Sequence, residues 1–173
     1  MKPKFLLFIL FFLPFLSACN STDDVGRIFT GKTWKLTGIW EEKKPEMVNL
    51  WSDEAQKRAS LKLLEGSNNF FVTFDGAEDK NIIIGNFNGR GVVSSFEGKW
   101  KANGENNEFS TSNFKQTGGS ESDILAKVFI EGLKPNPNNN NRDNRYYSGD
   151  ENNLYIYFTY ENKTIRLAFG KKN

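Results

Sequence analysis

The chain has 173 residues, of which 23 are lysine or arginine, 21 are aspartate or glutamate, one is cysteine and none is histidine. This length accommodates one domain core rather than two, and the missing histidines remove the commonest general base and the commonest transition-metal ligand. Without Lys2 and Lys4, which belong to a predicted leader, the chain carries 21 basic and 21 acidic residues. It therefore lacks the basic surplus that nucleic-acid binding requires, and we predict no nucleic-acid partner, no metal and no cofactor.

The N-terminus has the three zones of a secretory signal peptide. Lys2 and Lys4 precede an apolar run over residues 5–15, and small residues stand directly before Cys19. Spanning ~30 Å of hydrocarbon takes about 20 apolar residues, so this run is too short to stay in the membrane. The segment Leu16-Ser17-Ala18-Cys19 resembles the bacterial lipobox, which implies that the leader is removed and that the Cys19 thiol is acylated. The alternative is an ordinary secretory signal with a chance cysteine.

These observations predict a signal peptide over residues 1–18, a lipidated tether over 19–29 and a single β domain over 30–173. Two or three acyl chains hold a protein firmly, because each buried methylene contributes ~0.8 kcal/mol. The residue after the cysteine is Asn20, whereas an aspartate there would resemble an inner-membrane retention signal. We therefore predict an outer-membrane lipoprotein that faces the periplasm or the cell surface.

Aromatic residues form 14% of the chain and alternate in short runs separated by Gly, Asn and Asp. This pattern is typical of antiparallel strands joined by tight turns. The first strand is predicted to place Trp34, Leu36, Gly38 and Trp40 on one face. Four more strands are predicted over residues 70–74, 82–87, 92–100 and 108–115, with turns at 75–76, 88–91 and 103–104.

A first helix is predicted between these strands, with Ser52 or Asp53 as its cap and Gly66 as its end. Its apolar face is narrow, so we expect it on the surface or across one end of the sheet.

A second helix is predicted to begin after Ser120 or Ser122 and to end at Gly132. Its apolar stripe, which includes Phe129, is expected to pack across the sheet. Residues 135–144 are nearly all Asn and Pro and are expected to form a mobile loop.

The chain closes with a predicted hairpin in which apolar residues alternate on both strands. A two-residue turn at Asn162-Lys163 would place Tyr160 opposite Ile165 and Phe158 opposite Leu167, with all apolar side chains on one face. The fold class is thus mainly β (α+β): a curved antiparallel sheet or partial barrel with one packed amphipathic helix and a second, shorter helix.

Tyr155 and Tyr157 alternate out of phase with the apolar residues of this hairpin, and Arg166 falls on their side. A tyrosine pair on a sheet face can stack against a sugar or an apolar patch of a partner. These three residues are the candidate partner-binding site. The alternative is that the helix with Phe129 covers this face.

The order of these parts resembles the META-domain family of small bacterial lipoproteins, the HslJ-like group, particularly its Bacteroidota members. The resemblance implies a curved sheet with a packed helix and an envelope role, and it supplies no catalytic residues. A distant lipocalin-like lipoprotein is the competing assignment. The segments that carry the META resemblance are Gly31–Leu36, Phe70–Phe74, Gly98–Trp100, Lys127–Leu133 and Leu154–Phe158.

Paired carboxylates occur only as sequence neighbours in expected loops, such as Asp150-Glu151, where solvated charge is the simpler interpretation. We therefore predict no catalytic residues and no enzymatic activity. The preferred hypothesis is a monomeric, lipid-anchored envelope domain with a structural or binding role toward a protein or glycan partner. The alternative is a lipocalin-like small-ligand carrier or a glycan hydrolase or binding protein, for which a cavity of ~300 Å³ or more would be expected.

Overall fold

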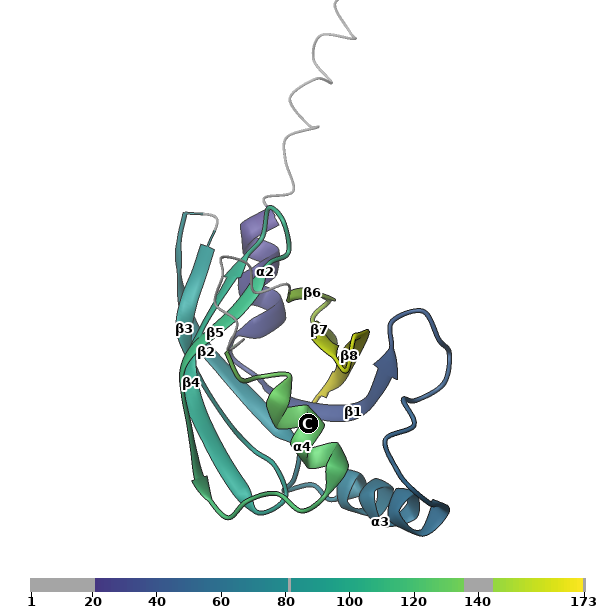
Figure 1. Ribbon diagram of the computed structural model, residues 1–173. Helices are drawn as coiled ribbons and strands as arrows, with labels where there is room; N and C mark the ends of the chain where they lie inside the picture. The colour runs from purple at the N-terminus through teal and green to yellow at the C-terminus, as the bar shows by residue number, and fades with distance from the viewer. Residues whose placement is uncertain (1–20, 81, 136–144, 173) are drawn as a thin grey trace, which may run out of the picture.

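The computed structural model describes residues 21–80, 82–135 and 145–172 (Figure 1). It contains one eight-stranded antiparallel sheet with the strand order β5-β4-β3-β2-β1-β8-β7-β6. The elements, in chain order, are α2 (Ser21–Phe29), β1 (Thr33–Glu41), α3 (Glu54–Glu65), β2 (Phe71–Asp79), β3 (Ile82–Arg90), β4 (Ser94–Asn103), β5 (Phe109–Gly118), α4 (Ile124–Glu131), β6 (Tyr146–Gly149), β7 (Asn153–Tyr160) and β8 (Lys163–Lys171).

The sheet curls until its two edges touch at one end. Glu108, next to β5, forms an isolated bridge with Tyr146 of β6. The Tyr147 N–H donates to the carbonyl of Asn107 at 3.0 Å. Among the described residues the two edges meet only in this short stretch, and the sheet is otherwise open. The predicted mainly β class with a curved antiparallel sheet is confirmed.

Helix α2 lies inside the curve, between the two halves of the sheet (Figure 1). Val25, Ile28 and Phe29 are buried, and they form one apolar stripe because they are spaced by three and four residues. The prediction of a tether over residues 19–29 is therefore wrong from Ser21 onward, where the helix begins. The loop predicted over 135–144 lies, apart from its first residue, outside the described residues.

Helix α4 packs on the same inner face, toward the other end of the sheet. The Phe129 ring lies 5.6 Å from Phe96, 5.9 Å from Phe70 and 6.1 Å from Phe169, measured between ring centroids. The predicted packing of this helix across the sheet is confirmed. With eight residues it is shorter than α3, which has twelve, so the expected order of helix lengths is reversed.

Both of these helices are capped by aspartate. Asp53 caps α3 as predicted and accepts from the backbone N–H groups of the first turn, and Gly66 ends the helix. Helix α4 is capped by Asp123, not by Ser120 or Ser122 as predicted. Asp123 also accepts a 2.5 Å hydrogen bond from the Ser60 hydroxyl of α3, and this bond ties the two helices together.

Two segments that were predicted as turns lie within strands. Strand β2 continues through Asp75-Gly76 to Asp79, and β3 continues through Asn88 to Arg90. Gly76 is paired with Gly85, and a Cβ atom on Gly85 would come within 1.6 Å of the Asp75 carbonyl oxygen. These glycines therefore allow a close approach of two strands rather than a reversal of the chain.

Strand β1 contains an irregularity that changes its inner face. The pairing with β8 shifts register between Leu36 and Gly38. Beyond this bulge Ile39 is buried in the core, whereas Trp40 is only half-buried. The prediction that Trp40 shares a face with Trp34 is therefore wrong, because one extra residue reverses the alternation.

The final hairpin has the predicted strands but another register. Its turn is Glu161-Asn162, where both residues have positive φ (47° and 63°), and Phe158 therefore faces Ile165 rather than Leu167. The shift amounts to two residues. Since side chains alternate with a period of two, every apolar residue keeps its predicted face.

A buried carboxylate organises the β3–β4 connection. Glu121 accepts hydrogen bonds from the N–H groups of Val92 (3.0 Å), Val93 (3.2 Å) and Ser94 (3.0 Å) and from the Ser94 hydroxyl (2.7 Å). A Cβ atom on Gly91 would lie 2.2 Å from the Glu121 Oε1, so only glycine leaves room for this arrangement. The carboxylate thus satisfies the backbone donors of two connecting residues and of the first residue of β4.

We expect Glu121→Ala to lower the free energy of unfolding by about 2 to 4 kcal/mol, because it leaves these donors without an acceptor. Glu121→Gln should cost less, since one acceptor oxygen remains. Denaturant unfolding measures both. The control is Glu97→Ala, which removes an exposed carboxylate and should change stability little. A loss of stability no larger than that of the control would contradict the role of Glu121.

Lys35 connects β1 to the segment after α3. Its ammonium group donates to the carbonyls of Gly66 (2.8 Å) and Asn69 (2.6 Å). Partial burial, and to a lesser extent the charge of Lys172, lowers the pKa of Lys35 to about 8 from its ordinary 10.5. Between these two pH values the unfolded chain binds more protons at this position than the folded one.

The contribution of Lys35 to the free energy of unfolding should therefore rise with pH between about 8 and 10.5. Lys35→Met lacks this titration, so the stability difference between wild type and variant should move in favour of the wild type over that range. Chemical unfolding at several pH values measures the difference. Parallel pH profiles for the two proteins would show that Lys35 keeps its ordinary pKa.

Candidate functional site

The three predicted site residues lie together on the outer face of the sheet. Arg166 of β8 is paired with Tyr157 of β7 on one side and with Trp40 of β1 on the other, and Tyr157 is paired with Tyr146 of β6. One row of side chains therefore crosses four strands, with Tyr155 beside it. We call Trp40, Tyr146, Tyr155, Tyr157 and Arg166 the aromatic face.

The side chains of the aromatic face stack on one another. The guanidinium carbon of Arg166 lies 5.7 Å from the Trp40 ring centroid and 5.4 Å from that of Tyr155, within the range of cation–π attraction. The rings of Tyr146 and Tyr157 are parallel within 8°, with centroids 4.3 Å apart. The buried Nε of Arg166 has no hydrogen-bond partner among the described residues, so it is a donor that the fold leaves unused.

Two tyrosine hydroxyls are positioned by polar neighbours. The Tyr146 hydroxyl donates to Glu42 Oε1 at 2.5 Å, and those of Tyr157 and Ser148 lie 3.3 Å apart. Burial, followed by the hydrogen bond to Glu42, raises the pKa of Tyr146. Tyr146 therefore remains a neutral donor, and its ring is held flat against Tyr157.

The alternative that a helix covers this face is wrong. Helix α4 packs through Phe129 on the inner face of the sheet, where its neighbours include Phe70 and Phe169. Over β6, β7, β8 and β1 the outer face carries the side chains of the aromatic face instead. A Cβ atom on Gly38 would come within 2.4 Å of the Trp40 indole, so this ring lies directly over the backbone of β1.

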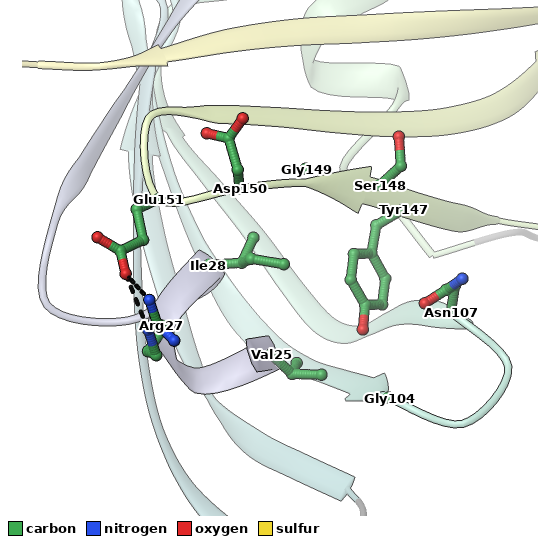
Figure 2. A pocket seen from close by; sticks show the side chains of 10 residues that line it. All are labelled: Val25, Arg27, Ile28, Gly104, Asn107, Tyr147, Ser148, Gly149, Asp150 and Glu151. Carbon is green, nitrogen blue, oxygen red and sulfur yellow. Dashed lines mark hydrogen bonds and ion pairs between the residues drawn. The ribbon is translucent and has the colours of Figure 1, made fainter. Parts of the chain in front are cut away.

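A second feature is a cleft of about 480 Å³ at the α2 end of the sheet (Figure 2). We call it the end cleft. Figure 2 shows that α2 forms one wall, while β6 and the turns after β4 and β6 form the others. Its lining residues are Val25, Arg27, Ile28, Gly104, Asn107, Tyr147, Ser148, Gly149, Asp150 and Glu151.

The carboxylates of the end cleft are engaged in structural contacts. Glu151 pairs with Arg27, whose Nε donates at 2.8 Å, and this partner lowers the pKa of Glu151. Asp150 accepts from the backbone N–H groups of Asn152 (2.7 Å) and Asn153 (2.8 Å), and its pKa is lowered chiefly by the hydrogen bond from Asn152. Both carboxylates favour the ionised form, which makes them poor proton donors near neutral pH.

Among the described residues, no group of three or more His, Cys, Asp or Glu side chains could hold a metal ion. No helix in the same residues is long and apolar enough to cross a membrane. The predicted lipid attachment residue, Cys19, lies outside the described residues.

Sequence reasoning missed Trp40, Tyr146 and the end cleft. The bulge in β1 moves Trp40 to the outer face, and β6 is a four-residue strand that follows an Asn-rich run without a strand-like pattern of its own. The end cleft is lined by three segments that are distant in sequence. The alternation of Tyr155 and Tyr157 was the one signal that pointed to the outer face.

Residues 20–171 match a family model described as Domain of unknown function (DUF4847). The chain belongs to this family. The matched range includes α2, in agreement with its place in the core. A search of curated proteins finds no match to the chain. The family model has no link to the META-domain family, so the resemblance to that family stays a prediction.

Proposed function

We propose that this protein is a non-enzymatic, lipid-anchored domain of the cell envelope that binds an acidic glycan through its aromatic face. The observation that carries the proposal is the Arg166 guanidinium, which lies against the rings of Trp40 and Tyr155 on the outer face of the sheet. Among the described contacts, the Arg166 guanidinium forms no ion pair with a carboxylate of the protein. It is therefore suited to bind a carboxylate of a ligand.

The neighbours of Arg166 favour a sugar as the carrier of that carboxylate. Aromatic side chains can pack against the apolar C–H face of a pyranose ring, and the hydroxyls of Tyr157 and Ser148 can exchange hydrogen bonds with sugar hydroxyls. Guanidinium binds carboxylate through two parallel hydrogen bonds. Because the row crosses four strands on an open sheet face, it fits an extended chain better than a single small molecule.

The end cleft supports a second candidate function, that of a small-ligand carrier. Its volume of about 480 Å³ falls within the range of small-molecule sites. However, Asp150 and Glu151 are already engaged by protein partners. Beyond the cleft, the space inside the curved sheet is filled by the Phe29 ring and the aromatic rings that pack against it. We therefore favour the aromatic face as the binding site.

The anchor can be tested separately from binding. Cys19→Ser should leave the precursor uncleaved or release it in soluble form, because Cys19 is the only thiol in the chain. Metabolic labelling with radioactive palmitate should mark the wild type and not the variant, and mass spectrometry should find an acylated N-terminal cysteine. A mature wild-type protein with an unmodified Cys19 would refute the anchor.

Binding can be measured by calorimetry with polygalacturonate as the acidic probe and dextran as a neutral control. Wild type should bind polygalacturonate only. Tyr157→Ala should weaken binding about fivefold or more, because it removes a stacking surface worth about 1 kcal/mol or more. Arg166→Lys should weaken it about fivefold or more, since it keeps the charge but loses the planar guanidinium.

The matched control is Lys99→Ala, which removes one positive charge from the exposed surface of β4 and should bind like wild type. Near-UV circular dichroism establishes that each variant remains folded. Equal binding of both polymers, or equal affinity of the Arg166→Lys variant and wild type, would contradict the proposal. Binding of neither polymer, together with capture of an envelope protein that Arg166→Ala abolishes, would replace the glycan by a protein partner.

A further inference from the structure

We infer that the α2 end of the domain lies directly against the membrane surface, so that the end cleft opens toward the lipid headgroups. This inference rests on the lipid anchor of the proposed function and adds an orientation to it. Its basis is the short stretch of chain between the anchor residue Cys19 and a helix that is fixed in the core.

The available reach follows from covalent geometry. Cys19 precedes Ser21, the first residue of α2, by two positions, and an extended chain spans at most about 3.6 Å per residue, which gives about 7 Å. The helix cannot swing away to lengthen this reach, because Val25 and Phe29 are buried. Even if the chain were extended as far as Val25, six residues would reach only about 22 Å.

The strand pairing shows which other elements lie at the α2 end of the domain. Ile82 is paired with Asn103, which places the tip of the β2–β3 hairpin beside the turn after β4. Gly149 is paired with Leu154, so the turn after β6 lies where β7 begins. Val93 lies at the opposite end of β4, a strand of ten residues that is about 30 Å long.

The chemistry of the α2 end suits contact with headgroups rather than insertion into the bilayer. Its exposed side chains include Lys80, Glu105, Asn106 and Asp150, which are polar and of both charges. Ile84, near the start of β3, is an exposed apolar side chain. Because the charged side chains described here have both signs, this end has little affinity of its own for anionic lipid. The acyl chains therefore impose the orientation, and the aromatic face remains accessible along the side of the domain.

The orientation can be measured with the full-length acylated protein in vesicles of phosphatidylethanolamine and phosphatidylglycerol. An environment-sensitive fluorophore is attached to Asn106→Cys at the α2 end or to Val93→Cys at the other end; both positions are exposed. The acylated Cys19 does not react with the label. Headgroup-spin-labelled lipid should quench the fluorophore at position 106 at least twice as strongly as the one at position 93.

Mass spectrometry of the same samples separates the two ideas under test. An unmodified Cys19 would refute the anchor of the proposed function. Confirmed acylation with equal quenching at both positions, or with stronger quenching at position 93, would overturn the orientation alone. A leaderless Cys19→Ser protein should not associate with the vesicles, and binding by it with the same quenching pattern would overturn the conclusion that the anchor imposes the orientation.

Discussion

The fold depends on one aromatic side chain at the centre of the curved sheet. The ring of Phe29, on α2, lies 5.2 Å from Phe74, 4.7 Å from Trp100, 5.7 Å from Phe109 and 5.0 Å from Tyr147. These four partners belong to β2, β4, β5 and β6, so a single residue contacts both edges of the sheet. Burial of large aromatic surface is the dominant favourable term in such a core, which explains why the edges approach and pair beside Tyr146.

Much of this fold was predictable because side-chain alternation is a strong local signal. The inner face of the last hairpin was correct even with a register error of two residues, since an even shift preserves the face. The positions at which the alternation of side chains is interrupted cannot be read from the local sequence. The bulge at Leu36–Gly38 and the Gly76–Gly85 pair both arise from contacts with neighbouring strands. Helix α2 carried an apolar stripe, but nine residues behind a leader resemble a tether until their burial is known.

The candidate site also combines residues that were predictable from the sequence with residues that were not. Tyr155, Tyr157 and Arg166 were predictable because β7 and β8 are consecutive and alternate regularly. Trp40 and Tyr146 join them only through sheet order, which places β1 beside β8 and β6 beside β7. This order of strands cannot be derived from a single sequence. The alternative of a helix over this face failed for the same reason, because α4 packs through Phe129 on the inner face of the sheet.

The two halves of the functional proposal are linked through α2. The helix fills the core with Phe29, and its first residue follows the proposed anchor residue by only two positions, so the proposed lipid would be held close to the centre of the sheet. The aromatic face is held just as firmly, since its rings stack on one another before any ligand arrives. A surface that is already ordered loses little side-chain entropy on binding. In the proposed arrangement, the anchored domain would present one fixed side to long molecules running along the envelope.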